Sequence, residues 1–429
     1  MKPETIALHA GYDGDRQNTR AATTPIYQTT SFTFDDTQHG ADLFDLKVPG
    51  NIYSRIMNPT NAVLEERLAQ LEGGVGALSV GSGMAAIRYA IEAITEAGNN
   101  IVSTSQLYGG TYNLFAHTFP RQGIDVRFAD GGDLDALASL IDENTRALFC
   151  ESIGNPAGNV VDIQRWAEIA HAAGVPLIVD NTVATPMLCR VFDYGADIAV
   201  HSLTKYIGGH GTTIGGAIVD SGKFDWTAQP ERFAVMNTPD PSYHGVVYTE
   251  ALGPAAYIGR CRVVPLRNTG AALSPHSAFM IMQGLETLAL RMERHCENAE
   301  AVAKYLEAHP RVLRVNYATL ENSPYKANCE KICGGRASGI LSFELQGGLA
   351  AGARFIDALQ MILRLVNIGD AKSLACHPAS TTHRQLNPQE LASAGVSEEM
   401  VRLSIGIEHI DDIIEDLEQA LAASVAKPL

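Results

Sequence analysis

The sequence lacks the features that identify several large classes of protein. It has no hydrophobic run of the roughly 18 residues that a membrane-spanning helix needs, and its first residues, Met1-Lys2-Pro3-Glu4-Thr5, contain no apolar segment typical of a secretory signal. Basic residues do not cluster, and 32 Lys and Arg are outnumbered by 48 Asp and Glu, for a formal net charge of -16. We therefore expect a cytoplasmic protein that binds neither membranes nor nucleic acids.

The cysteines and glycines also lack the spacings of familiar sites. Seven irregularly spaced cysteines do not match a disulfide framework, and Cys329 and Cys333 have no second Cys or His pair at zinc-site spacing. The chain contains neither Gly-x-Gly-x-x-Gly nor a Walker-type loop with its lysine, which argues against NAD and ATP. We expect reduced thiols and no metal site.

The composition is that of a large globular protein. Hydrophobic residues make up 46% and charged residues 19% of 429 residues, which is enough material for a sizeable core. This length predicts more than one domain. We divide the chain into an N-terminal arm at residues 1–60 that reaches a neighbouring subunit, a large domain at 61–268 and a C-terminal α+β domain at 269–429.

Between residues 75 and 220, apolar segments rich in β-branched residues alternate with helical ones. This alternation predicts an α/β fold with a mostly parallel seven-stranded sheet between helices. Ligands of such sheets bind beyond the carboxyl ends of the strands, where Asp180 and the turn 202–205 are expected. The predicted strands cover residues 76–80, 100–103, 125–128, 145–150, 176–180, 198–200 and 216–219, and a helix covers 163–173.

The rest of the chain has weaker patterns. Residues 1–60 are expected to be irregular, with an extended segment at 21–32, and a helix is expected after Pro59 because apolar residues from Asn61 onward have helical spacing. Short helices and loops are predicted for 221–268, one long helix for 279–307, a helix for 351–362, and strands at 341–345 and near Leu365 and Val401.

Lys205 and Asp180 together suggest one cofactor. Lys205 lies in a run with Ser and Thr, and Asp180 ends the apolar segment 175–180. A lysine can form a Schiff base with the aldehyde of pyridoxal phosphate, and an aspartate can keep the pyridine nitrogen protonated, so that the ring accepts electrons. Each residue alone has a plainer interpretation, as a surface lysine or a helix-capping aspartate. Their occurrence together, among other matching segments, favours pyridoxal phosphate.

Small and hydroxyl-bearing residues provide a candidate phosphate site. Ser82-Gly83-Met84 follow a predicted strand and precede a helix, whose N-terminal amides favour a phosphate. The hydroxyls of Ser202 and Thr204 can hydrogen-bond the same group. A plain tight turn is the alternative for the glycine segment, because Gly-x-Gly alone is weak evidence.

Two polar residues follow other predicted strands, and two more lie in the arm. Tyr108 could stack on a flat ring or simply pack, and Asn155 could contact a ring hydroxyl or initiate a turn before Pro156. In the arm, Arg55 could bind a phosphate in a bidentate manner. If the arm crosses a subunit interface, Tyr53 and Arg55 would complete the partner's site; otherwise they are ordinary surface residues.

Arg402 is a charged residue in an apolar strand. A charge there is costly unless it is paired, so a substrate carboxylate or a structural Asp or Glu is expected beside it. The loop with Ser373 and Leu374 could help to bind the same carboxylate.

Taken in order, these segments resemble the Cys/Met-metabolism family of fold-type I pyridoxal phosphate enzymes, over nearly the whole chain. The segments 38–44, 226–257, 283–288 and 374–383 are most similar to the O-acetylhomoserine sulfhydrylases of that family. The motifs that carry the resemblance are Tyr53-Ser54-Arg55, Ser82-Gly83-Met84, Tyr108-Gly109-Gly110, Asp180-Asn181-Thr182, Ser202-Leu203-Thr204-Lys205, residues 369–374 and Arg402-Leu403-Ser404.

The resemblance implies a role for each candidate. Lys205 would carry pyridoxal 5'-phosphate and move protons between substrate carbons, Asp180 would pair with the pyridine nitrogen, and Tyr108 would stack on the ring and act as an acid–base group. Arg402, helped by Ser373 and Leu374, would hold the substrate α-carboxylate. The other cofactor-binding residues would be Tyr53 and Arg55 from a neighbouring subunit, and Ser82, Gly83, Met84, Asn155, Thr182, Ser202 and Thr204.

The implied reaction is γ-replacement on O-acetyl-L-homoserine, in which sulfide or a thiol such as methanethiol gives homocysteine or methionine, in methionine biosynthesis. The alternatives within the family are methionine γ-lyase, the cystathionine γ-synthase and lyases, and a sulfhydrylase of O-succinylhomoserine. A non-enzymatic relative and a nicotinamide dehydrogenase are disfavoured, by the intact catalytic set and by the missing dinucleotide motif. The expected assembly is a homotetramer, a dimer of dimers with shared active sites.

Overall fold

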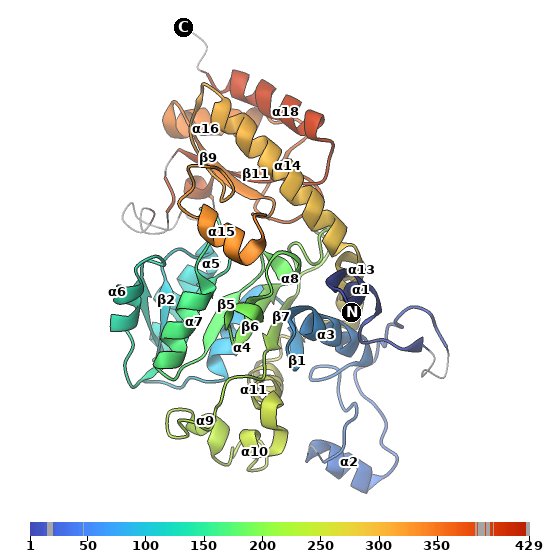
Figure 1. Cartoon of the computed structure of the whole chain (residues 1–429). Coiled ribbons are helices and arrows are strands. Elements are labelled where there is room, and N and C mark those ends of the chain that lie inside the picture. The colour runs from blue at the N-terminus through green and yellow to red at the C-terminus, as the bar shows by residue number, and fades with distance from the viewer. Residues whose placement is uncertain are drawn as a thin grey trace.

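Two β-sheets organise the chain (Figure 1). All strands of the first sheet lie between residues 76 and 220, and all strands of the second between 312 and 404. In this computed structural model, the described residues are 1–14, 20–45, 47–381, 384, 391, 395–397 and 399–425.

The first sheet has seven strands in the order β1-β7-β6-β5-β4-β2-β3. β7 runs antiparallel to both β1 and β6, and the remaining neighbours are parallel. This confirms the predicted mostly parallel seven-stranded sheet. Its strands are β1 (Gly76–Val80), β2 (Asn100–Thr104), β3 (Asp125–Ala129), β4 (Thr145–Glu151), β5 (Leu177–Asp180), β6 (Ile198–Ser202) and β7 (Gly216–Asp220).

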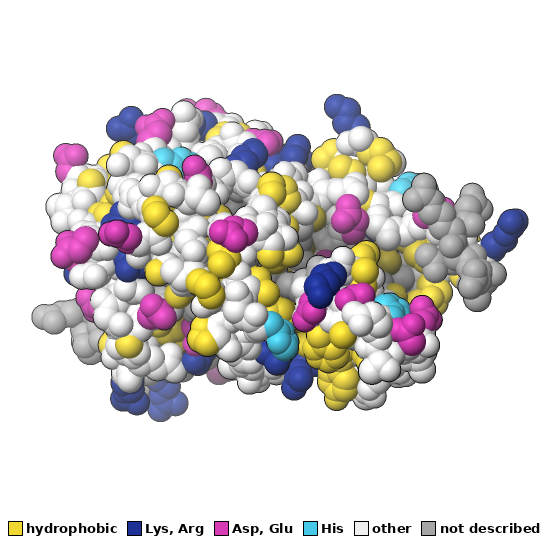
Figure 2. Space-filling model, turned by 90° about the horizontal axis from the view of Figure 1, so that it is seen from below, with side chains coloured by type: hydrophobic (Ala, Val, Ile, Leu, Met, Phe, Trp, Pro, Cys, Tyr) yellow, Lys and Arg dark blue, Asp and Glu magenta, His cyan; other side chains and the backbone are white. Residues whose placement is uncertain are grey.

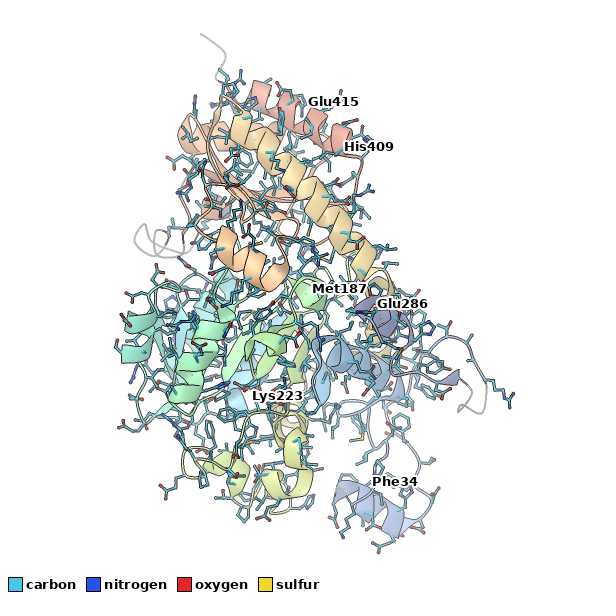
Figure 3. All side chains as sticks on the ribbon, in the orientation of Figure 1. Phe34, Met187, Lys223, Glu286, His409 and Glu415 are labelled. Carbon is cyan, nitrogen blue, oxygen red and sulfur yellow. The ribbon has the colours of Figure 1, made fainter. Side chains whose placement is uncertain are left out.

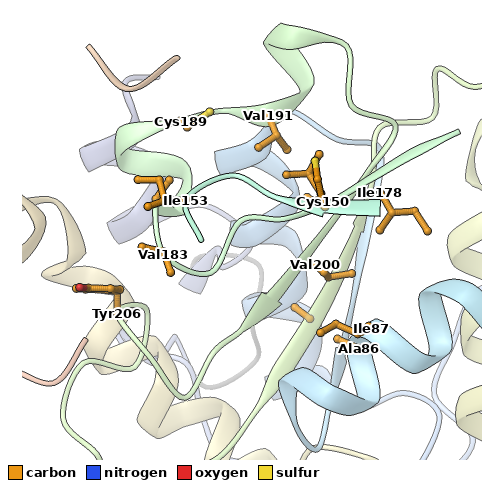
Figure 4. Close-up of a cluster of buried hydrophobic side chains, with 14 of the residues drawn as sticks. Ala86, Ile87, Cys150, Ile153, Ile178, Val183, Cys189, Val191, Val200 and Tyr206 are labelled. Atoms are coloured by element: carbon orange, nitrogen blue, oxygen red, sulfur yellow. The ribbon is translucent and has the colours of Figure 1, made fainter. Parts of the chain in front are cut away.

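Helices cover both faces of this sheet, and apolar side chains fill the space between the layers. In Figure 4, Ala86 and Ile87 of α4 approach Val200 from one side, while Cys189 and Val191 lie on the other. The helices of this part are α3 (Pro59–Glu72), α4 (Gly83–Glu92), α5 (Gly109–Asn113), α6 (Leu134–Ser139), α7 (Ile163–Ala172) and α8 (Thr185–Leu188).

Local sequence signals explain where α3 begins and ends. The Asn58 side chain accepts a hydrogen bond from the Thr60 amide, and Pro59 occupies the first turn, where its missing N–H costs nothing. The helix stops at Gly73, which has a φ of +82° and so takes the left-handed conformation that favours glycine.

The second sheet has five strands in the order β10-β11-β12-β9-β8. Two helices pack against it, α14 (Leu288–Ala308) and α16 (Gly348–Ala358), and α18 (Ile410–Ala423) packs against both of them. They form the upper part of Figure 1. The strands are β8 (Val312–Asn316), β9 (Ile340–Leu345), β10 (Leu363–Arg364), β11 (Leu374–Cys376) and β12 (Met400–Ser404), and α15 (Lys326–Cys333) connects β8 to β9.

The single long helix expected at 279–307 is wrong. The structure has α13 (Pro275–Glu286) and α14 with a break at Thr287, whose φ and ψ are -106° and 8°. At the break the Arg291 guanidinium donates to the Gly284 main-chain oxygen at 2.6 Å. The apolar spacing continues through the break, so it could not reveal it. α13 packs on α3 of the first part of the chain, whereas α14 packs on β8 and β9 of the second sheet. The division into domains at residue 268 stays a prediction.

The arm is less irregular than expected. It contains α1 (Pro3–His9), which packs on α3, and α2 (Thr37–Phe44). Asp36 caps α2 by accepting a hydrogen bond from the His39 amide at 2.7 Å, a short-range signal that composition alone conceals. Phe34, labelled in Figure 3, lies beside α2 and away from the two sheets.

The segment 221–268 contains short helices, as predicted. They are α9 (Ala234–Asn237), α10 (Tyr248–Leu252), α11 (Ala256–Cys261) and α12 (Arg267–Thr269). On the face seen in Figure 2, acidic and basic side chains are dispersed among apolar and neutral ones. Across the described ranges, no helix has the length and apolarity to cross a membrane.

Candidate active site

A cavity of about 230 Å³ lies at the carboxyl ends of β4, β5 and β6. Its walls also include the first turn of α4, the turn after β6, the segment 366–368 and one residue of β12. This is the edge of a parallel sheet where ligands are expected. The predicted site residues that line it are Ser82, Gly83, Met84, Tyr108, Asn155, Asp180, Thr182, Ser202, Thr204, Lys205 and Arg402.

Lys205 is held in the turn that follows β6. Its amide donates to the Ser202 main-chain oxygen at 3.2 Å, and its Nζ donates to Asn367 Oδ1 at 2.6 Å. Burial, and then the charge of Arg402, lower the pKa of Lys205 to about 8, because both disfavour the ammonium form. The side chain is therefore much closer to a neutral, nucleophilic amine than an exposed lysine is.

Two carboxylates, one buried and one partly exposed to the cavity, stand side by side at the ends of neighbouring strands. Glu151 of β4 and Asp180 of β5 are partners in the sheet register. Burial raises the pKa of Asp180, while burial and then the Asp180 charge raise the pKa of Glu151. Among the described residues neither forms an ion pair within 4.0 Å. A bound cation next to Asp180 would relieve this repulsion, and a protonated pyridine ring fits that need.

Glu151 is a residue that the sequence reasoning missed. Its Oε1 accepts a hydrogen bond from the Tyr108 amide at 2.7 Å, and its Oε2 accepts one from the Asn155 amide at 3.3 Å. It therefore fixes the main chain at two predicted site residues. Glu151 ends a predicted apolar strand, as Asp180 does, and this position could have marked it as a site residue.

The first turn of α4 offers an anion cradle. Ser82 caps the helix, with its Oγ accepting from the Ala85 amide at 3.1 Å. A Cβ on Gly83 would lie 2.6 Å from the Ser202 Cβ, so only glycine permits this close approach. The open amides of the helix start and the hydroxyls of the β6 turn thus converge, which suits a phosphate.

Arg402 is a buried guanidinium without a carboxylate partner in the described part of the chain. It is 3% exposed; its Nη1 donates to Asn155 Oδ1 at 3.1 Å, and its Nη2 donates to the Asn367 main-chain oxygen at 2.9 Å. Its Nε makes no hydrogen bond. Since a buried charge needs compensation, this arrangement is suited to bind a carboxylate that enters the cavity.

Asn367 is the second residue that was missed. It lines the cavity and contacts both Lys205 and Arg402. From the sequence, Ser373 and Leu374, a few residues further along, were expected to assist Arg402 instead. Asn367 is the one polar residue in the stretch 365–368, and this was the signal that could have found it.

Four predicted site residues lie elsewhere. Ser373 and Leu374 do not line the cavity; the Ser373 hydroxyl donates to Glu408 Oε2 at 2.9 Å and accepts from the Gly406 amide at 2.8 Å. Tyr53 and Arg55 line a separate hollow of about 300 Å³, with the guanidinium carbon 5.4 Å from the tyrosine ring centre. The roles predicted for these four residues stay predictions.

Two further expectations concern the segment 374–383 and a metal site. Thr382 and His383, at the end of the segment 374–383, lie outside the described residues. In the described ranges, no group of three or more His, Cys, Asp or Glu could hold a metal ion.

Comparison with known proteins shows a single family over nearly the whole chain. Residues 4–422 match the model of a family described as Cys/Met metabolism PLP-dependent enzyme. The chain is 52% identical to a homocysteine synthase of Schizosaccharomyces pombe, over 97% of each chain. It is 49% identical to an O-acetyl-L-homoserine sulfhydrylase of Leptospira meyeri, over 98% of this chain and 97% of the relative.

A solved structure agrees with this. It is a crystal structure of a Campylobacter jejuni protein assigned as an O-acetylhomoserine (thiol)-lyase, described with a pyridoxyl-lysine monophosphate in its chain. The two folds superpose with a TM-score of 0.96 at 44% identity, over 98% of this chain and 100% of the other. This protein therefore belongs to the Cys/Met-metabolism family of pyridoxal-phosphate-dependent enzymes.

Proposed function

We propose that the protein exchanges the acetate group of O-acetyl-L-homoserine for sulfide, forming L-homocysteine and acetate. The observation that carries the proposal is the buried Arg402, which has no carboxylate partner among the described residues and shares Asn367 with the amine of Lys205. This arrangement suits an amino acid whose carboxylate binds Arg402 while its amine lies near Lys205. Relatives named homocysteine synthase and O-acetyl-L-homoserine sulfhydrylase support this choice of substrate.

The residues around the cavity fit pyridoxal phosphate. Lys205 would carry it, Asp180 would pair with its ring nitrogen, and Tyr108 would stack on the ring. When bound, the cofactor supplies an electron sink for the electrons released at the substrate Cα. The phosphate would be held by the first turn of α4, with Ser82, Gly83 and Met84, and by Ser202 and Thr204. Asn155 would contact the ring hydroxyl, Thr182 would also bind the cofactor, and a neighbouring subunit would contribute Tyr53 and Arg55.

The protein's own groups bind, orient and move protons. Arg402 would make a two-pronged contact with the substrate carboxylate and so direct the Cα proton toward Lys205. With its lowered pKa, Lys205 can accept that proton and return protons at neutral pH. Over the whole reaction the Cγ–O bond to acetate breaks, a Cγ–S bond forms, and acetate leaves.

Product analysis tests the reaction. The purified holoenzyme is incubated with O-acetylhomoserine, with and without sulfide. Homocysteine that forms only with sulfide is the expected result; rapid release of 2-oxobutyrate in both cases would overturn it in favour of elimination. O-succinylhomoserine and methanethiol, tested in parallel, define the acyl group and thiol.

The role of Lys205 has its own test. Lys205→Ala should abolish both turnover and the visible absorbance of the bound cofactor. Lys372→Ala is the matched control, because Lys372 is an exposed lysine whose ammonium lies 3.6 Å from Asp370. Retained turnover in Lys205→Ala would refute the role.

We also propose that the enzyme works in the cytoplasm as a homotetramer, a dimer of dimers with shared sites. Seven unpaired, buried cysteines support the compartment. The arm supports the assembly, because it exposes several large apolar side chains, which usually mark an interaction surface. They include Ile26, Tyr27, Phe34, Phe44, Val48 and Tyr53. Sedimentation of a fully active monomer would contradict shared sites.

A further inference from the structure

An ion pair between Glu65 and Arg262 is bonded to the turn of the arm that carries Tyr53 and Arg55. Glu65 belongs to α3 and Arg262 follows α11, and their side chains are only 11% and 22% exposed. Arg262 Nη2 donates to Glu65 Oε2 at 2.6 Å, and Nη1 donates to the Ile56 main-chain oxygen, also at 2.6 Å. One guanidinium therefore joins α3 to the residue next to Arg55.

Glu65 is itself held in place by β1. Its Oε1 accepts hydrogen bonds from both the amide and the hydroxyl of Ser79, each at 2.8 Å. Arg262 Nη2 also donates to the Ala77 main-chain oxygen of the same strand, at 3.2 Å. Since β1 leads into the cradle formed by Ser82–Met84 at the start of α4, one strand supports both the candidate phosphate site of its own cavity and the turn in the arm.

The turn is closed by its own main chain and fixed by two side chains. The Ile56 amide donates to the Tyr53 main-chain oxygen at 2.9 Å. Asn58, which caps α3, donates from Nδ2 to Ser54 Oγ at 2.9 Å, while Arg262 holds the Ile56 carbonyl. Because the turn is closed, a shift of this carbonyl would carry the neighbouring residues of the turn with it.

The two candidate residues of the turn face away from the cavity of their own chain. Tyr53 is 41% exposed, and Arg55 is exposed as well. Neither lines the cavity that contains Lys205. A group that is already held in its bound conformation loses less entropy when it binds. A firmly anchored turn that presents an aromatic ring and a guanidinium to the outside therefore suits a site on another subunit.

We propose that Glu65 and Arg262 are positioning residues for the cofactor of the neighbouring subunit, because they fix the turn from which Tyr53 and Arg55 reach that cofactor. The inference rests on the shared sites proposed above. Without the ion pair the turn leaves its position for part of the time, and the apparent affinity for the cofactor falls with the fraction that is correctly placed. The chemistry of a loaded site is unaffected, since Lys205 stays in place.

The first measurement is the affinity of the full-length oligomer for pyridoxal phosphate, by equilibrium dialysis. Arg262→Met removes the guanidinium, and Glu65→Gln keeps an oxygen for Ser79 but removes the ion pair. Both variants should bind about tenfold more weakly, as for the loss of one hydrogen bond to a charged group, with kcat at saturating cofactor within about twofold of the wild type. Glu286→Gln is the matched control: it breaks another ion pair of α3, with Arg67 at 3.1 Å, whose arginine is bonded to the end of α1. Its affinity should equal that of the wild type.

The second measurement shows in which subunit the pair acts. Arg262→Met and Lys205→Ala chains with different affinity tags are co-expressed, and mixed oligomers are isolated on both tags. In these oligomers the intact lysine of one chain meets the intact arm of the other. The visible absorbance of the bound cofactor should therefore reveal a class of sites with the wild-type affinity, which neither variant shows alone. If all lysine-bearing sites stay about tenfold weaker, the pair acts within its own subunit and the inference is overturned.

Arg55→Ala separates this inference from the shared site itself. The same mixture is made with Arg55→Ala in place of Arg262→Met. If that mixture regains affinity while the Arg262→Met mixture does not, only the inference about the pair fails. If neither regains it, the shared site is wrong and the inference falls with it. Unchanged affinity in Arg262→Met or Glu65→Gln alone also overturns the inference. Circular dichroism confirms folding, and Glu65→Gln takes the place of Arg262→Met throughout if the latter does not fold.

Discussion

Lys205 Nζ and Asn367 Oδ1 lie 2.6 Å apart and join the two sheets across the cavity. Lys205 follows β6 of the first sheet, and Asn367 lies between β10 and β11 of the second. The main-chain oxygen of Asn367 also accepts a hydrogen bond from Arg402. One residue thus orders the two groups on which the proposed chemistry depends.

The Asn367→Ala variant should lower kcat/KM about ten- to hundredfold. It removes the side-chain contact to Lys205 but keeps the main-chain contact to Arg402, and a hydrogen bond to a charged group contributes about 1.5–3 kcal/mol. Steady-state kinetics with O-acetylhomoserine and sulfide measure the effect. Leu365→Ala, at an exposed position of the same segment, is the control. Equal kinetics in both variants would show that the contact has no catalytic importance.

Arg402→Lys should raise KM for the amino acid at least tenfold, with a smaller change in kcat. A lysine cannot reproduce the planar, two-pronged contact with a carboxylate, and it also loses one of the bonds to Asn155 and Asn367. The KM of the variant is compared with that of Arg364→Lys, which changes an exposed arginine on β10. An unchanged KM would mean that the substrate carboxylate binds elsewhere.

Attachment of the cofactor should depend on pH in a way that reflects Lys205. In cofactor-free protein the neutral amine attacks the aldehyde, so the rate should rise with pH through about 8 and not through the ordinary lysine value of 10.5. Replacing Arg402 by Met removes a positive charge that lowers this pKa, so the midpoint should move upward. Absorbance after mixing with pyridoxal phosphate gives the rate. A wild-type midpoint near 10.5 would contradict the prediction.

Gly83→Ala should weaken cofactor binding at least tenfold. The new Cβ would lie 2.6 Å from the Ser202 Cβ, so the first turn of α4 and the β6 turn must move apart, and the amides and hydroxyls no longer meet at one phosphate. Equilibrium dialysis measures the affinity. At Gly132 the nearest atom to a new Cβ is 3.4 Å away, so Gly132→Ala should bind as the wild type does; a similar loss in both would implicate general instability.

Patterns within one strand or helix were predicted well, and relationships between distant segments were not. The seven strands of the first sheet were found because buried parallel strands are short apolar runs between helices. The break at Thr287 was missed because it depends on Arg291 reaching Gly284. In the arm, α2 was missed because its cap is a single residue, Asp36, in a polar segment.

The site was predicted in the same uneven way. Lys205, Asp180 and Arg402 are unusual where they stand, so sequence alone marked them, and the structure brings them to one cavity. Asn367 and Glu151 are unremarkable in sequence and gain importance only from what they touch. The direction of Ser373 toward Glu408 likewise depends on tertiary packing that no local pattern expresses.

The cavity lies between the two sheets, so the residues proposed for cofactor binding and those proposed for substrate binding come from two separate stretches of the sequence. The cavity residues proposed to hold the cofactor lie between positions 82 and 205, while Asn367 and Arg402, proposed to face the substrate, come from the part of the chain that forms the second sheet. If these roles hold, mutations in the later stretch can alter which acyl amino acid is accepted while Lys205 and its surroundings stay intact. New specificities can arise in this scaffold without a loss of its chemistry.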